Sequence, residues 1–158
     1  MLEDVILGIN RAAEGAASEA APIFLNSITS MTISDGWNIL KGEDNAATTY
    51  LKSTTNAELY GLYSPKINNY LGKDLAGSGI SVTSSWKKLT TAWNSFVAVN
   101  NLVSSTKYNE VNSDLGGYLT QKALDGMYLK IADEEKQIRT DPIARVTDIL
   151  KKVFGSLD

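Results

Sequence analysis

The sequence predicts an all-α protein, a single compact bundle of about seven or eight helices over residues 1–158. Three observations support this class. Apolar residues recur at spacings of three and four, which is typical of amphipathic helices. Ser, Thr, Asp and Pro stand where these segments begin and Gly where they end, as helix caps do. No window alternates apolar and polar residues with the period of two that a half-buried strand shows.

The first predicted helix runs over about residues 2–20, and its second half is built almost entirely from small residues. Residues 12–18 are Ala, Gly and Ser apart from Glu14. Small side chains let a second helix approach closely, so this stretch is expected to pack against a neighbour, with a ligand-facing groove as the alternative. Pro22 then suits the first turn of the next helix.

Capping residues predict the boundaries that follow. Thr32 or Ser34 can cap a short helix over residues 35–41, which Gly42 ends. The other boundaries are an Asp44 cap for a helix over residues 45–53, a capping box at residues 55–58, and a start at Ser64 and Pro65 for a helix that Gly72 ends.

Two connections divide the second half of the chain. Residues 73–81 are rich in Gly and Ser, and residues 100–114 are polar and mixed, so both are predicted as loops. Residues 115–139 then form a long predicted helix. Asp141 is the predicted cap of the last helix and Pro142 its first residue, and Gly155 ends this helix.

The helix between the two loops carries one apolar seam that includes two tryptophans. Its members alternate spacings of four and three: Val82, Trp86, Leu89, Trp93 and Phe96. Such a seam predicts a helix face that packs into the core. The alternative is a surface for a hydrophobic ligand or a protein partner.

The composition excludes several kinds of chemistry. The chain has no cysteine and no histidine, which removes disulfides, thiol catalysis, thiolate or imidazole metal sites and histidine-dependent triads. We therefore expect neither a cofactor nor a metal. The net charge of -3 disfavours nucleic acid as a partner. No apolar run approaches the ~20 residues of a membrane span.

Polar groupings are the candidates for a binding site. Asn10, Arg11 and Glu14 share one helical turn, where spacings of three and four bring side chains together. The remaining candidates lie further along the chain: Asp35, Thr48, Tyr50, Arg139 and Arg145. Asp35 also suits the first turn of a helix, and Arg139 has Glu135 four residues before it, so structural roles are open for both.

Glu14 has two interpretations. In the first, it pairs with Arg11 or with an arginine of the last two helices and ties the two ends of the chain together. In the second, Glu14 is an acid or base of a hydrolase or lyase, with Arg11 and Arg139 or Arg145 as catalytic partners. Glu14, Arg11, Arg139 and Arg145 are the candidates for any catalysis.

An ordered set of short motifs resembles a bacterial family, domain of unknown function 4197. The motifs occupy residues 9–14, 20–24, 31–35, 39–42, 45–50, 122–127, 134–135, 138–139, 141–145 and 150–155. The motif residues that match are Asn10, Arg11, Glu14, Asp35, Gly42, Thr48, Tyr50, Asp125, Arg139, Pro142 and Arg145. The resemblance covers almost the whole chain and implies no particular activity.

The resemblance also implies a cellular location. Members of the family are typically exported, often with a signal peptide or a lipoprotein start, and carry a further segment before the motif at residues 9–14. We therefore expect a periplasmic or outer-membrane-anchored protein, and an N-terminal segment that this chain lacks.

Three functional hypotheses follow. The leading one is a non-catalytic helical domain of the bacterial envelope that binds an unknown protein or an apolar small molecule. The second is the carboxylate and arginine hydrolase or lyase built on Glu14. The third is an architectural module that self-associates as a homo-oligomer through the Ala-rich first helix.

Overall fold

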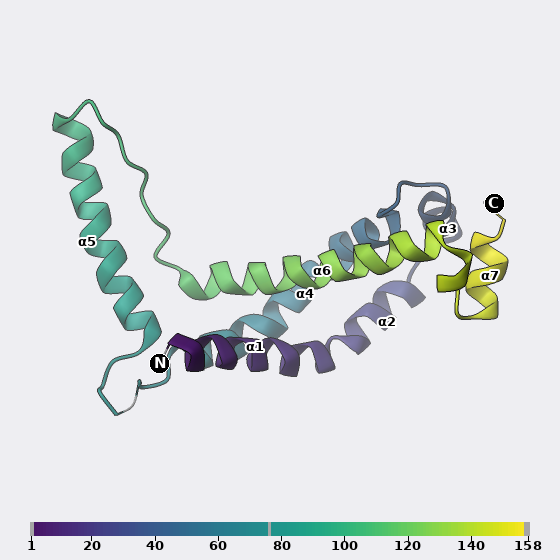
Figure 1. Ribbon diagram of the computed structural model, residues 1–158, viewed down its shortest axis with the longest axis horizontal. Helices are drawn as coiled ribbons and strands as arrows, with labels where there is room; N and C mark the ends of the chain where they lie inside the picture. The colour runs from purple at the N-terminus through teal and green to yellow at the C-terminus, as the bar shows by residue number, and fades with distance from the viewer. Residues whose placement is uncertain (1, 76, 157–158) are drawn as a thin grey trace. The chain divides into compact units, whose positions relative to one another are not determined.

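The computed structural model describes residues 2–75 and 77–156, and within them all regular structure is helical. The all-α prediction is therefore confirmed. The elements are α1 (Leu2–Glu19), α2 (Ala21–Thr29), α3 (Ile33–Leu40), α4 (Ala46–Leu71), α5 (Val82–Val103), α6 (Leu115–Thr140), the 3-10 turn η1 (Pro142–Ala144) and α7 (Asp148–Phe154) (Figure 1). None of these helices, over the described residues, is both long and apolar enough to cross a membrane.

The chain forms two compact units. Unit 1 comprises Met1–Ala17 and Leu62–Gln121, and unit 2 comprises Ser18–Gly61 and Lys122–Asp158. Helices α1, α4 and α6 each contribute residues to both units. The single domain expected over residues 1–158 stays a prediction.

Helix α4 corrects two of the predicted boundaries. The chain does not break at the capping box of residues 55–58 or at Ser64, and Pro65 lies inside one continuous helix. An interior proline costs about 3 kcal/mol because it lacks the N–H group that bonds to the preceding turn. A buried row with steps of four residues continues across it and offsets this cost: Thr55, Leu59, Tyr63, Ile67 and Leu71.

Unit 1 packs α1 and α6 against α4 at glycines. A β-carbon at Gly8 of α1 would collide with the ring of Tyr70, and one at Gly116 of α6 would collide with the side chain of Asn68. Both glycines are buried, as is Ala16. Of the small residues expected to pack closely, at positions 12–18, only Ala16 is buried, and the close approach to α4 is made instead at Gly8, outside that stretch.

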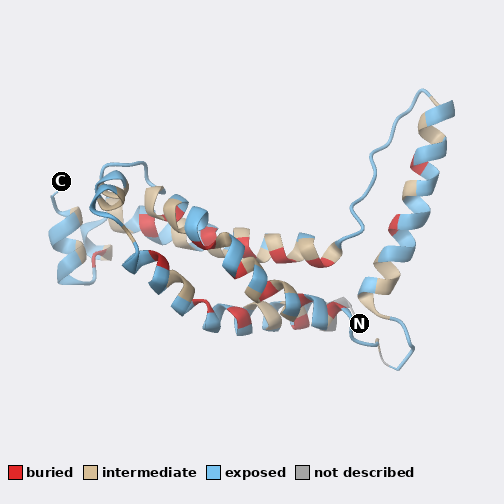
Figure 2. Cartoon of the chain, turned by 180° about the vertical axis from the view of Figure 1, so that it is seen from behind, coloured by how far each residue is buried: buried red, intermediate tan, exposed pale blue. Residues whose placement is uncertain are grey.

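Helix α5 of unit 1 corrects the predicted core seam. Leu89, Trp93 and Phe96 are 67%, 39% and 50% exposed, whereas the buried residues of α5 are Thr90 and Val97. Figure 2 shows most of this helix as exposed. The seam does not form a core, because no second helix packs on it. Residues 104–114, which are not helical, cover α5 instead on the face of Thr90 and Val97. Helix α5 also continues to Val103, into the predicted connection of residues 100–114.

Unit 2 contains α2, α3, η1, α7 and parts of α4 and α6. Its buried apolar residues include Ala20, Leu59, Leu124 and Tyr128. The hydroxyls of Thr55 and Tyr128 lie 2.7 Å apart inside this core. Burial raises the pKa of Tyr128, and the hydrogen bond with Thr55 partly opposes this.

Short-range capping largely follows the sequence in unit 2. Thr32 caps α3 in a reciprocal capping box with Asp35, and Asp141 accepts a hydrogen bond from the backbone N–H of Ile143. The helix predicted after Pro142 is interrupted, however, because η1 occupies residues 142–144 and α7 begins only after its own cap, Thr147.

Candidate functional site

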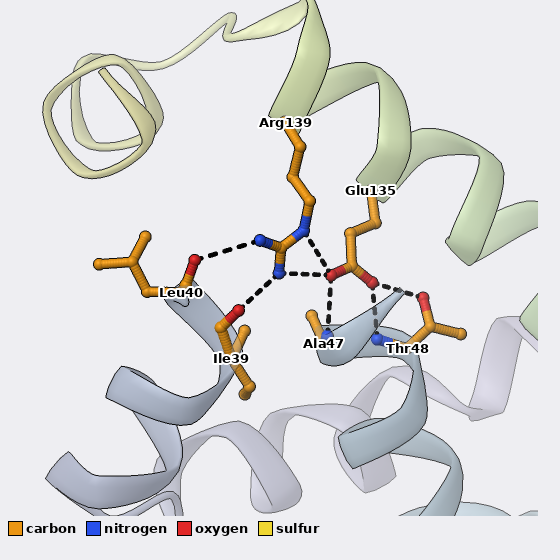
Figure 3. A network of polar contacts seen from close by, with 6 residues as sticks. All are labelled: Ile39, Leu40, Ala47, Thr48, Glu135 and Arg139. Atoms are coloured by element: carbon orange, nitrogen blue, oxygen red, sulfur yellow. Dashed lines mark hydrogen bonds and ion pairs between the residues drawn. The ribbon is translucent and has the colours of Figure 1, made fainter. Parts of the chain in front are cut away.

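Glu135 of α6 anchors the first turn of α4. Its two carboxylate oxygens accept hydrogen bonds of 2.8 Å from the backbone N–H groups of Ala47 and Thr48 and from the Thr48 hydroxyl (Figure 3). N–H groups in the first turn of a helix have no partner within the helix, and the positive end of the helix dipole favours a carboxylate there. The predicted cap, Asp44, is instead exposed and lies 3.7 Å from the ammonium of Lys136.

Arg139 extends this network to the end of α3. Its Nε and Nη2 donate to Glu135 Oε1 at 2.9 and 2.8 Å. Nη2 also donates to the carbonyl oxygen of Ile39 at 2.7 Å, and Nη1 to that of Leu40 at 3.3 Å (Figure 3). A guanidinium suits the last carbonyls of a helix, which carry the negative end of its dipole. We call Thr48, Glu135 and Arg139 the clasp, because they join α3, α4 and α6.

The clasp is almost closed to solvent. The side chains of Arg139 and Glu135 are 7% and 6% exposed. Burial raises the pKa of Glu135, but the hydrogen bonds from Ala47, Thr48 and Arg139 together outweigh it and hold that pKa below its ordinary value. Glu135 is therefore an ionised, fully engaged carboxylate, and this makes it a poor proton donor.

Arg145 secures the chain just after α6. Its side chain is buried, and the residue as a whole is 3% exposed. Nε donates to the carbonyl oxygen of Ile138 at 2.9 Å, and Nη2 to that of Arg139 at 3.0 Å. These bonds satisfy carbonyls in the last turn of α6 and hold η1 against it, so this arginine supports the backbone that carries Arg139.

A cavity of about 290 Å³ adjoins the clasp. Its lining comes from α2, α3, α4, α7 and the turn after α2: Ile28, Met31, Gly36, Ile39, Leu40, Ala47, Leu51, Val153 and Phe154. Ile39, Leu40 and Ala47 belong to both structures, because their backbone atoms bond to the clasp. The Arg139 guanidinium also lies 5.4 Å from the centre of the Phe154 ring, a favourable cation–π contact.

The structure brings three of the sequence-predicted site residues together: Thr48 and Arg139 lie in the clasp and Arg145 lies directly behind it. Tyr50 and Asp35 belong to the same unit but make separate contacts. The Tyr50 hydroxyl lies 3.4 Å from the carbonyl oxygen of Ser27. Hydrogen bonds from the side chain and backbone of Thr32 lower the pKa of Asp35. Binding roles for these five residues stay predictions.

Asn10, Arg11 and Glu14 lie on α1 and are exposed. Among the described residues of unit 1 Glu14 forms no ion pair with Arg11, so this half of the expected pairing is wrong, whereas pairing with an arginine near the C-terminus, which belongs to unit 2, stays a prediction. An exposed pair three residues apart gains only a few tenths of a kcal/mol, which does not hold two long side chains together. The carboxylate that does pair with Arg139 is Glu135.

Sequence reasoning missed the second role of Glu135 and the cavity. The four-residue spacing to Arg139 predicts their ion pair, but nothing local predicts that the same carboxylate caps a helix 87 and 88 residues earlier. The only available signal was negative: residues 46–48, at the start of α4, contain no acidic side chain to meet their own N–H groups. Across the described residues, no group of three acidic side chains could hold a metal ion.

Comparisons with known proteins give one result. No curated protein and no solved structure matches this chain. The model of a family described as a protein of unknown function, DUF4197, matches residues 1–155. This match covers nearly the whole sequence and includes every element of the clasp and the cavity. The chain therefore belongs to the DUF4197 family.

Proposed function

We propose that unit 2 is a non-catalytic binding domain that takes a small apolar molecule into the cavity beside the clasp. The observation that carries this proposal is the cavity of about 290 Å³ with a lining of aliphatic and aromatic side chains. Ligand pockets in proteins typically begin at about 300 Å³, and apolar cavities of roughly half that size bind benzene. The volume therefore suits one ring system or a short hydrocarbon chain.

The chemistry of the clasp favours a neutral ligand. The guanidinium of Arg139 is already engaged by Glu135 and by two backbone carbonyls. A charged ligand group would have to displace one of these partners in a buried setting, where leaving a charge unpaired is costly. The clasp therefore serves to fix α3, α4 and α6 around the cavity, and it offers no free charge to the ligand.

The same contacts support binding over catalysis. General acid–base chemistry needs a group whose pKa lies near the working pH, and the environment of Glu135 moves its pKa in the opposite direction. The hydrolase or lyase hypothesis requires Glu14 as acid or base, and Glu14 is an exposed carboxylate on α1. A protein partner that inserts one apolar side chain into the cavity is the alternative occupant.

Gly36 provides a direct test. It lines the cavity, and a β-carbon built on it meets no atom within 4 Å. A side chain at this position therefore has room at its first atom, and we expect Gly36→Leu to occupy part of the cavity. We expect the protein to bind N-phenyl-1-naphthylamine, a neutral fluorophore that brightens in apolar surroundings, and the G36L variant to bind it at least tenfold more weakly.

Gly126→Leu is the matched control. Gly126 is an exposed helical glycine of α6, and a β-carbon there also meets nothing within 4 Å. This variant gains the same side chain away from the cavity and should bind the fluorophore like the unmodified protein. Equal binding by G36L and the unmodified protein would show that the cavity is not the site.

A further inference from the structure

Helix α5 has two distinct faces. One of them is occupied by residues 104–114, which join α5 to α6 and which we call the return segment. Asn94 and Asn101 each bind the backbone of one residue in this segment through both the amide nitrogen and the amide oxygen. The Asn94 bonds to Val111 are both 2.9 Å, and the Asn101 bonds to Tyr108 are 2.8 and 3.0 Å. These pairs imitate the hydrogen bonding of a neighbouring β-strand.

Three more side chains continue this pattern. Trp86 Nε1, Trp93 Nε1 and Asn100 Nδ2 donate to the carbonyl oxygens of Asn112, Asn109 and Thr106 at 3.1, 3.1 and 2.7 Å. We call these five side chains of α5 the ladder: Trp86, Trp93, Asn94, Asn100 and Asn101.

The ladder has a regular register, made of two series. Trp86, Trp93 and Asn100 are seven residues apart, as are Asn94 and Asn101, which corresponds to about 10.5 Å along a helix. The residues that they bind are three apart, which corresponds to about 10 Å along an extended chain. The two repeats match, so the return segment runs alongside α5 between Trp86 and Asn101 (Figure 1).

The other face of α5 is largely exposed. Leu89, Phe96, Val99 and Val103 are 67%, 50%, 63% and 83% exposed, and Ala92 lies between them. We call these five residues the open face. Their spacings of three, four, three and four residues are those of the first and fourth positions of a coiled-coil heptad. One edge of this face is in contact with the ladder side, because the Phe96 ring centre lies 5.6 Å from that of Trp93 and 6.0 Å from that of Tyr108.

We propose that the open face pairs with the open face of a second copy of this chain, with the two α5 helices antiparallel. Charge supports this occupant. The only charged residues of α5 are Lys87 and Lys88, near its N-terminal end, and the open face carries none. A parallel pair would bring four lysines together, whereas an antiparallel pair places the two copies of Lys88 about 18 Å apart along the axis, beyond two Debye lengths at physiological salt.

Side-chain size supports the same orientation. In the antiparallel register centred on Asn94, Leu89 faces Val99 of the other copy and Ala92 faces Phe96. The methyl group of Ala92 leaves the space that the Phe96 ring needs. A parallel register would instead oppose two Phe96 rings and leave a gap between two Ala92 residues.

The available area suits a weak dimer. At roughly 150 Å² for one large apolar side chain, the exposed fractions of the open face leave on the order of 400 Å² on one copy. This lies within the range of the largest apolar patches of typical monomers, which often mark interaction sites. Pairing two such faces removes on the order of 800 Å², the size of a weak, concentration-dependent interface.

Sedimentation equilibrium of the whole chain tests the association. We expect a concentration-dependent dimer. Phe96→Glu should raise the dissociation constant of this dimer at least tenfold. Thr91→Glu places the same charge on an exposed position of α5 outside the open face and should leave the dimer unchanged. Equal helical content by circular dichroism checks that both variants fold.

Cysteine cross-linking tests the orientation, because the chain contains no cysteine of its own. Under mild oxidation, Leu89→Cys and Val99→Cys should each stay uncross-linked alone and should form a disulfide dimer when mixed. Cross-linking of L89C with itself would overturn the antiparallel register. A monomer at all concentrations, or a dimer that F96E leaves intact, would overturn the proposal, and neither result depends on the cavity of unit 2.

Discussion

The clasp of unit 2 and the ladder of α5 use the same kind of contact in opposite settings. Both join polar side chains to backbone N–H and carbonyl groups. The clasp bonds to backbone groups span 87 to 100 residues of sequence, and the Glu135 and Arg139 side chains that make them are 6–7% exposed. The ladder bonds span 6 to 26 residues and are exposed.

Burial decides which of these polar contacts hold the fold together. A buried, charge-assisted hydrogen bond is strong, and removal of one partner leaves the other charge buried without compensation. An exposed hydrogen bond competes with water, so its net value is small. The clasp is therefore expected to fix the tertiary structure of unit 2, whereas the ladder only aligns a segment along one helix.

The largest expected effect comes from breaking the clasp. Arg139→Ala should lower the free energy of unfolding by about 3–5 kcal/mol, because the buried Glu135 carboxylate then loses its counter-ion. Urea denaturation measures this change. Lys136→Ala, on the same helix, removes only an exposed 3.7 Å pair with Asp44 and should cost less than about 1 kcal/mol. Similar losses for the two variants would contradict the difference drawn between buried and exposed pairs.

An intermediate effect is expected from acid. Since the folded-state pKa of Glu135 lies below its ordinary value of 4.5, this group stabilises the fold above that pH, and the contribution is lost as pH falls through the lower, folded-state pKa. Urea denaturation as a function of pH should show stability declining below about pH 4.5. Glu135→Gln should flatten that part of the profile. An unchanged pH dependence in E135Q would show that Glu135 titrates as it does in the unfolded chain.

The smallest effect is expected from the ladder. Asn94→Ala removes two exposed hydrogen bonds to Val111 and should lower the free energy of unfolding by no more than about 1 kcal/mol. The change should instead be local, with faster hydrogen exchange at the Val111 amide. Ser95→Ala, which removes only a bond to the preceding turn of α5, should leave that amide protected. A loss in N94A as large as that in R139A would refute the comparison.

Local features of the sequence predicted much of the fold. The capping box of Thr32 and Asp35 is present in the structure, and the helix expected over residues 115–139 is α6, Leu115–Thr140. These features depend on residues within one or two turns of each other, so neighbouring side chains suffice to predict them. Family membership, suggested by ordered motifs, is confirmed over residues 1–155.

Local signals failed where tertiary contacts outweighed them. The boundaries at residues 55–58 and at Pro65 are ordinary helix starts in isolation, but the buried row of α4 keeps one helix intact across them. The tryptophan seam of α5 has the correct helical spacing, yet periodicity shows only that a helix has an apolar face and does not show what covers that face.

The candidate site divides in the same way. Sequence patterns suffice to predict the helix class, most helix ends, the chemistry excluded by the absence of cysteine and histidine, and the Glu135–Arg139 pairing within one turn. The caps and contacts between distant segments emerge from the folded chain alone: Glu135 caps α4, Arg139 binds the end of α3, and a cavity opens beside them. The physical reason is that capping and helical spacing act between neighbours in the chain, whereas burial and long-range charge pairing depend on which distant segments meet.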